Sequence, residues 1–141
     1  MQLKTNSEEE TILLGERIGR ELPPNSVVCF FGDLGAGKTT FIKGLARGCV
    51  SASTEQIHSP TFVYLHIYEG SKTLYHFDLY RLHDQDEFLS MGFEEYFFAG
   101  GICCIEWSER IAALLPPHCI KVCIDHAGNN ERKISITPWD E

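Results

Sequence analysis

Apolar residues along this chain follow two spacings that predict different elements. A continuous apolar run at 26–31, rich in valine and phenylalanine, predicts a buried strand. From 39 to 48 the apolar residues recur every three or four positions, which predicts a helix with one apolar face. Gly48 is placed to end that helix. The two patterns together predict a strand followed directly by a helix.

The same helical spacing occurs once before this unit. Ser7 and Glu10 have the spacing of a capping box, in which each side chain satisfies a backbone N–H at the start of a helix. Apolar residues then fall on one helical face until Pro23, which cannot continue a helix. We therefore expect an N-terminal helix that begins after Ser7.

The remainder of the chain alternates between strands and helices. Strand-like runs at 62–68 and 73–77 are joined by a short polar turn, so they predict a hairpin. A second hairpin is expected from a strand at 118–125 and a partner strand that carries Ile134 and Ile136.

Between the two hairpins the pattern predicts a buried strand between two helices. The wholly apolar run 102–105 is typical of a strand buried on both faces. A helix is expected over 84–98, with Asp84 as its N-cap, and another from Ser108 to 115. The fold class is therefore α/β, with a mixed parallel and antiparallel sheet of six or seven strands flanked by three or four helices.

The segment between the first strand and its helix carries the clearest chemical motif. Residues 32–39 match the phosphate-loop pattern G-x-x-x-x-G-K-[ST] without a mismatch. In such a loop the backbone N–H groups surround an anion at a helix N-terminus. Lys38 supplies a charge for the β- and γ-phosphates, and the Thr39 hydroxyl is a ligand for Mg²⁺. The pattern predicts a P-loop NTPase-like fold that binds a nucleoside triphosphate with Mg²⁺.

Two carboxylates follow predicted strands at positions suited to this site. Asp78 ends one strand and Glu106 another, and ligands of open α/β sheets bind beyond the carboxyl ends of the strands. We expect both to lie near the phosphate loop, where Asp78 orients or deprotonates the attacking water. Thr61 stands at the start of a predicted strand and is a weaker candidate, whose hydroxyl would contact the γ-phosphate or the metal. His76 orients Asp78 or has a structural role, and Trp107 is a core anchor or a ligand contact.

Length and charge limit the function classes. At 141 residues the chain is the size of one domain, 1–141. A formal net charge of −8 argues against direct binding of DNA or RNA, because that depends on clusters of lysine and arginine. No run approaches the ~20 apolar residues that span a bilayer, and residues 1–10 lack the apolar core of a secretory signal. The six cysteines include no C-x-x-C pair, which is typical of reduced thiols in a cytoplasmic protein.

Four further motifs give the chain a family resemblance. Together with the phosphate loop, the segments 59–62, 75–82, 91–93 and 105–108 resemble the bacterial TsaE (formerly YjeE) family, in the same order. The block 75–82, Tyr-His-Phe-Asp-Leu-Tyr-Arg-Leu, is much more specific than a phosphate loop alone. The likeness extends from about 11 to 136.

The resemblance implies a small ATPase of tRNA modification. The family acts with TsaD and TsaB to place threonylcarbamoyl on N6 of adenosine 37, in tRNAs that read codons beginning with A. The partners would present the tRNA, which agrees with the acidic charge of this chain. By motif match, Thr39 and Glu106 would bind Mg²⁺, Asp78 would assist hydrolysis, and Thr61 would lie in a switch-like loop. The expected nucleotide-binding residues are Leu34, Gly35, Ala36, Gly37, Lys38, Thr39, Thr40 and Trp107, with Thr11 and Arg132 near the base.

Three other functions are compatible with a phosphate loop. A small-molecule kinase needs cations that close over the transferred phosphate, and only Arg81 and Arg110 lie near the predicted strand ends. A guanine-nucleotide switch is disfavoured because no Asn-Lys-x-Asp sequence is present. A nucleotide-dependent regulatory module with negligible turnover would act by ordering loops.

Overall fold

A seven-stranded sheet forms the centre of the molecule in a computed structural model that describes residues 1–32, 37–50 and 64–139. The strands are β1 (Gln2–Thr5), β2 (Val27–Phe31), β3 (Leu65–Tyr68), β4 (Leu74–Asp78), β5 (Ile102–Glu106), β6 (Ile120–His126) and β7 (Arg132–Thr137). Their order across the sheet is β1-β7-β6-β2-β5-β4-β3. The predicted α/β fold with a mixed sheet is confirmed.

The centre of the sheet is parallel and its edges are antiparallel. Strand β5 lies between β2 and β4 and is parallel to both, and β2 is also parallel to β6. The two predicted hairpins, β3–β4 and β6–β7, flank the parallel strands, and β1 pairs antiparallel with β7 at one edge. Because β2, β4 and β5 run in one direction, their carboxyl ends share one edge, where the residues that follow them come together.

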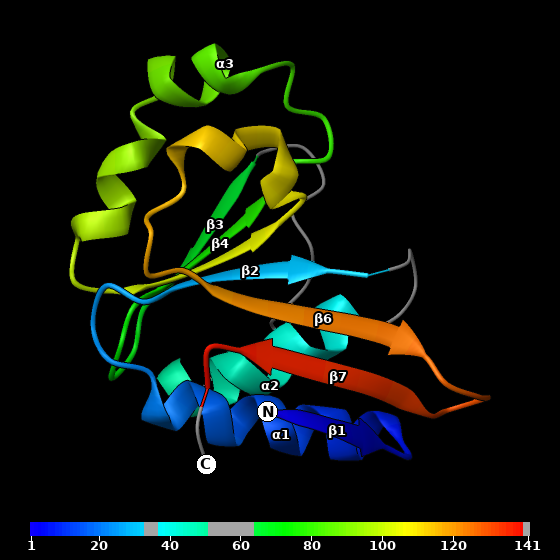
Figure 1. The fold of residues 1–141 in the computed structure, drawn as a ribbon. Helices are drawn as coiled ribbons and strands as arrows, with labels where there is room; N and C mark the ends of the chain where they lie inside the picture. Colours follow the sequence, from blue (N-terminus) through cyan, green and yellow to red (C-terminus); the bar gives the residue numbers. More distant parts are fainter. Residues whose placement is uncertain (33–36, 51–63, 140–141) are drawn as a thin grey trace.

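Two long helices cover one face of the sheet. Helices α1 (Glu8–Glu21) and α2 (Lys38–Val50) pack side by side there (Figure 1). The Ser7 hydroxyl accepts from the Glu10 N–H at 3.1 Å, so the predicted N-cap is confirmed. The prediction that Gly48 ends α2 is wrong, because the helix continues to Val50. A Cβ at Gly48 would overlap the carbonyl oxygen of Glu16, so this glycine allows α1 to approach α2.

Three short helical segments cover the other face, α3 (Gln85–Ser90) and the 3₁₀ segments η2 (Phe93–Phe98) and η3 (Ser108–Leu114). Asp84 caps α3 as predicted, accepting from the Glu87 N–H at 3.0 Å. The single helix expected over 84–98 is wrong, because Gly92 has a φ of 73° and separates α3 from η2.

The segment after β5 also differs from the expected helix. The prediction that Ser108 caps it is wrong, because Trp107 occupies the N-cap position with a φ of 62° and Ser108 lies buried inside η3. The left-handed region is unusual for a residue with a side chain, so the chain turns sharply directly after Glu106.

Strand β1 is an element that the hydrophobic pattern does not predict. It pairs with β7 at the edge of the sheet, and the N-terminal ammonium donates to the carbonyl oxygen of Ile136 at 3.0 Å. Only alternate residues of this strand face the core, so its sequence shows no apolar run. Its addition completes the seven strands. Among the described residues, no helix is both long enough and apolar enough to cross a membrane.

The candidate nucleotide site at the strand ends

The phosphate-loop sequence lies where the geometry of the sheet places it, between the end of β2 and the start of α2. Leu34, Gly35 and Ala36 lie outside the described residues, as does Thr61. Gly37 has a φ of 104°, a backbone conformation that suits glycine and disfavours other residues. Lys38 and Thr39 form the first turn of α2, so the N-terminus of this helix directly follows the phosphate-loop sequence.

Asp78 and Glu106 are brought together at the same edge. Strands β4 and β5 pair in parallel with Asp78 opposite Glu106, and Glu106 is also opposite Phe30 near the end of β2. Both carboxylates face the side of the sheet that α2 covers, because they stand two residues beyond His76 and Cys104 on strands whose side chains alternate. The expectation that both strand ends converge near the phosphate loop agrees with this arrangement.

The environment of Asp78 favours its neutral form. Burial raises the pKa of this carboxyl above its ordinary value, and the nearby charge of Glu106 adds to the shift. The Tyr80 N–H, which donates to Asp78 Oδ1 at 3.1 Å, and the charges of His76 and Lys38 lower the pKa and partly offset the rise. Asp78 is therefore a carboxylate with a raised proton affinity beside a lysine, which is a feature of groups that handle protons.

Glu106 is held by a buried histidine. Its Oε2 lies 2.8 Å from Nε2 of His76, whose side chain is completely buried, and Glu106 itself is 6% exposed. The carboxylate accepts this hydrogen bond when His76 carries its proton on Nε2. His76 Nδ1 then has no hydrogen-bond partner among the described residues. His76 therefore contacts Glu106, and Asp78 is not its hydrogen-bond partner.

Trp107 contributes an aromatic face beside the loop. The Lys38 Nζ lies 5.4 Å from the centre of its ring and donates to the Gly32 carbonyl oxygen at 3.2 Å. The guanidinium of Arg110 lies 5.8 Å from the ring centre, and the ring of Tyr80 lies 5.0 Å away. Trp107 is thus both half-buried and in contact with the phosphate-loop lysine, so it is more than a core anchor.

Thr11 and Arg132 converge from opposite ends of the chain on the same loop. Together with Gly37 and Thr40 they line a cavity of about 110 Å³. Arg132 Nε lies 3.6 Å from the point that a Cβ on Gly37 would occupy. The Thr11 hydroxyl is buried and lies 2.7 Å from that of Thr5, and the Thr11 N–H donates to the Ser7 carbonyl oxygen at 3.2 Å, so the polar groups of Thr11 are already paired within the protein. The two residues expected near the base therefore do lie beside the phosphate loop.

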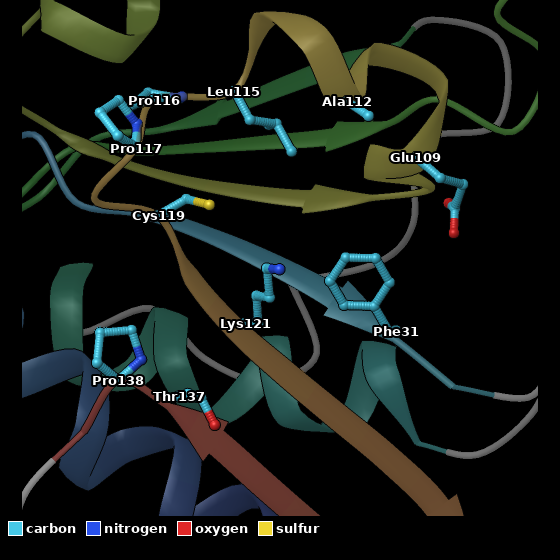
Figure 2. A pocket seen from close by; sticks show the side chains of 10 residues that line it. All are labelled: Phe31, Glu109, Ala112, Leu115, Pro116, Pro117, Cys119, Lys121, Thr137 and Pro138. Carbon is cyan, nitrogen blue, oxygen red and sulfur yellow. The ribbon is translucent and has the colours of Figure 1, made fainter.

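A larger cavity of about 530 Å³ lies on the opposite face of the sheet (Figure 2). It is bounded by η3 and the prolines that follow it, by Phe31, by the start of β6 and by the end of β7. None of the predicted nucleotide-binding residues lines it. Its size alone therefore does not make it the candidate site.

Sequence reasoning missed two contacts of this site. Tyr80 and Arg110 both lie against Trp107, and Tyr80 also donates its N–H to Asp78. The position of Tyr80, two residues after Asp78, is the only sequence signal for its contact. Nothing in the pattern signals that Arg110 turns back onto Trp107, because this depends on the left-handed backbone at Trp107.

A strand, a phosphate-loop sequence and a helix, with carboxylates at the ends of neighbouring parallel strands, define a P-loop nucleotide-binding protein. The family model described as threonylcarbamoyl adenosine biosynthesis protein TsaE matches residues 5–134. The chain belongs to the TsaE family.

Individual relatives agree over nearly the full length. The chain is 40% identical over 136 residues to the tRNA threonylcarbamoyladenosine biosynthesis protein TsaE of Treponema pallidum, covering 96% of this chain and 99% of the relative. It is 45% identical to the protein of the same name from Rickettsia conorii, over 93% of this chain and 74% of the relative. The crystal structure of Bacillus subtilis YdiB superposes with a TM-score of 0.78 at 34% identity, covering 96% of this chain and 83% of that chain.

Proposed function

We propose that this chain binds ATP with Mg²⁺ at the β2, β4 and β5 strand ends and hydrolyses it in the cytoplasm. Hydrolysis would serve the threonylcarbamoylation of adenosine 37 in tRNAs that read codons beginning with A. In this proposal the chain acts as one P-loop domain, 1–141, with proteins of the TsaD and TsaB type. The observation that carries the proposal is the convergence of Lys38, Asp78 and Glu106 beside a phosphate-loop sequence.

The residues at this edge suit a magnesium nucleotide. Mg²⁺ prefers oxygen ligands and is bound in such sites by one or two protein groups together with phosphate oxygens. Thr39 and Glu106 supply a hydroxyl and a carboxylate of that kind. The N-terminus of α2 and the Lys38 ammonium supply the positive potential that phosphates require. When bound, the metal would neutralise charge that develops on the phosphate oxygens during transfer.

Each side chain would then have a separate task. Lys38 would hold the phosphates, and Asp78, whose raised pKa favours accepting a proton, would orient the attacking water. His76 would fix the Glu106 carboxylate through the 2.8 Å hydrogen bond between them. Trp107, in contact with Lys38, would keep water away from one side of the loop. Thr11, Arg132 and Thr40 would border the nucleotide at the opposite side.

The charge of the chain supports indirect contact with tRNA. A protein with a net charge of −8 is repelled by a phosphate backbone, so a partner would hold the tRNA while this chain supplies ATP hydrolysis. The proposal takes its substrate from the names of the relatives, which describe tRNA threonylcarbamoyladenosine biosynthesis.

Reconstitution with purified TsaD, TsaB and an unmodified tRNA that reads A-starting codons tests the proposal. We expect the unmodified chain to support several rounds of tRNA modification and the Lys38→Ala chain to support none. Equal modification by the Lys38→Ala chain would contradict the proposed role. Asp78→Asn separates hydrolysis from binding. If this variant binds ATP and still supports full modification, the chain is a nucleotide-dependent regulatory module and its hydrolysis has no role.

A further inference from the structure

An exposed apolar and acidic surface lies on the side of the sheet away from α1 and α2. It consists of the outward-facing residues of α3, of η2 and of the Met91 between them, and we name it the α3–η2 surface. Helix α3 is at the top of Figure 1, with α1 and α2 toward the bottom. Leu89 is 44% exposed, Met91 49% and Phe98 67%. Single exposed leucines are common, but a phenylalanine with two thirds of its surface in water, at the end of a segment that follows two other exposed apolar residues in the chain, is a candidate interaction site.

The same surface is strongly acidic. Between 82 and 101 the chain has five carboxylates and no lysine or arginine: Asp84, Asp86, Glu87, Glu94 and Glu95. Asp84 caps α3, and Glu87 accepts hydrogen bonds from the Tyr64 hydroxyl and the His83 N–H. The other three carboxylates make no ion pair or hydrogen bond with a described residue. They therefore remain available to a positively charged partner.

A rigid layer of aromatic rings supports this surface. Phe88 and Phe97 are buried beneath it with their rings stacked 5.8 Å apart, and Phe77 of β4 lies 5.7 Å from Phe88. Because the buried rings fix α3 and η2 on the sheet, Leu89 and Phe98 are presented in a set arrangement. A preorganised surface loses little conformational freedom when a partner binds.

From these observations we propose that the α3–η2 surface docks a partner protein that offers an apolar pocket rimmed by lysine and arginine. The proposal rests on the proposed function, because it assigns the docking site for the partners of the tRNA-modifying assembly. Phe98, Leu89 and Met91 enter the pocket, and Asp86, Glu94 and Glu95 face its basic rim. Charged rims of this kind mainly speed association and select the partner, while buried apolar residues provide affinity.

Other occupants conflict with the charge of the surface. A second copy of this chain in a two-fold contact would set the same carboxylates against one another, because such an interface pairs a surface with itself. Nucleic acids and anionic membranes are repelled for the same reason. A basic protein surface is the occupant that satisfies both the apolar and the acidic residues.

This docking position is compatible with a bound nucleotide and is connected to it. The cavity that contains Thr11 and Arg132 is lined by α1, α2 and the β6–β7 turn, on the other side of the sheet from α3. Phe77, which packs on Phe88 and Phe93, directly precedes Asp78. A partner that shifts α3 and η2 would therefore move Phe77 and, through it, the adjacent Asp78.

Binding of the chain to an immobilised TsaD–TsaB pair, measured by biolayer interferometry with ATP and Mg²⁺, tests the proposal. We expect Leu89→Gln and Phe98→Ser each to weaken binding by about tenfold or more. The double charge reversal Glu94→Lys with Glu95→Lys is expected to slow association and to reduce its dependence on salt. The matched controls Leu13→Gln, which changes a 51% exposed leucine on α1, and Glu21→Lys with Glu69→Lys should bind as the unmodified chain does.

The failures of the two proposals are distinguishable. If the unmodified chain binds the pair and all surface variants bind equally well, the docking site is wrong and the proposed function stands. If the unmodified chain binds neither protein, the partner assignment fails and this docking site with it. Loss of a homodimer in the Phe98→Ser chain, measured by sedimentation, would show that the surface contacts a second copy and would overturn the proposal. ATP affinity, expected to be unchanged in all these variants, verifies that each is folded.

Discussion

The two faces of the sheet are built on different principles. On one face α1 and α2 are long helices over an aliphatic core, pressed together where a Cβ on Gly44 would overlap the Ile12 carbonyl oxygen. On the other face α3, η2 and η3 are short and are held by stacked and edge-on rings, among them Phe77, Phe88 and Phe93. At the glycine contacts of the first face there is no space for an added methyl group. On the second face the position of the short segments depends on contacts between large aromatic side chains.

This difference matches the tasks that we propose for the two faces. Close packing of α2 on α1 fixes the helix N-terminus that follows the phosphate-loop sequence, where small shifts would misplace the phosphate contacts that we propose. The short segments of the other face gain little from helical hydrogen bonding, so ring packing determines their position. Strand β4 joins the two faces, because Phe77 points into the aromatic layer while His76 and Asp78 point toward α2.

The largest effect is expected from removing a ring. Phe88→Ala should lower the free energy of unfolding by about 3–5 kcal/mol, because a completely buried ring in contact with three others leaves a cavity. Urea unfolding followed by fluorescence measures the change. Phe98→Ala, in the neighbouring segment η2, is the control, and its cost should be below about 0.5 kcal/mol because the ring is mostly exposed. Similar costs for both would show that the aromatic layer is not what holds this face.

Asp78→Asn tests the residue where the two faces meet. We expect ATP turnover to fall about 100-fold or more while ATP affinity changes little, because the substitution removes a proton acceptor and keeps the shape of the side chain. Single-turnover hydrolysis and calorimetry measure the two quantities. Unchanged turnover would remove Asp78 from the mechanism.

The stability of the same variant depends on pH in a direction set by the raised pKa. A carboxyl whose pKa is higher in the folded state contributes stability below its unfolded pKa, and this contribution is lost as the pH rises through the folded pKa. Asp78→Asn should therefore gain stability relative to the unmodified chain as the pH rises above about 4, the ordinary pKa of an aspartate. If Asp78→Asn instead lost stability relative to the unmodified chain as the pH rose, the folded protein would favour Asp78 as a carboxylate.

Adding one methyl group tests the glycine contact. Gly44→Ala should lower the free energy of unfolding by about 1–3 kcal/mol despite the better helix propensity of alanine, because α1 must move away from α2. We also expect weaker ATP binding, since that movement shifts the start of α2. The control Arg47→Ala removes a partly exposed ion pair with Glu16 and should cost below about 1 kcal/mol. A stabilising Gly44→Ala would contradict the close approach of the two helices.

The smallest effect concerns the hydrogen bond to Glu106. His76→Leu should raise the Mg²⁺ concentration needed for half-maximal ATP binding by about tenfold, because loss of an outer partner of a metal ligand typically costs 10–100-fold in affinity. His76→Gln should restore part of the loss, since its amide can donate to the same oxygen. Equal Mg²⁺ dependence of the Leu and Gln variants would assign His76 a purely structural role.

Sequence pattern predicts the elements that have a strong local signal. Six strands and the capped starts of α1 and α3 follow from apolar runs and from Ser7 and Asp84. Strand β1 does not, because four residues at a sheet edge gain their order from β7, at the other end of the chain. The break at Gly92 is also missed, since a helical spacing of apolar residues extends across it.

The candidate site likewise contains residues that the sequence identifies and contacts that it does not. The motif itself identifies Lys38 and Thr39, and strand ends identify Asp78 and Glu106. The contact between His76 and Glu106 arises from the parallel pairing of β4 with β5, whose register no local pattern specifies. The left-handed backbone of Trp107, which sets its ring beside Lys38, likewise has no signal in the residue type.

Calorimetric titration of ATP into the chain, with Mg²⁺ and then with Mg²⁺ chelated, tests the central claim most directly. The claim is that the phosphate loop and the β4 and β5 strand ends form one magnesium-nucleotide site. We expect one ATP per chain, with affinity lowered by chelation and by Glu106→Gln and abolished by Lys38→Ala. Absence of ATP uptake, or binding that neither Lys38→Ala nor Glu106→Gln alters, would contradict it.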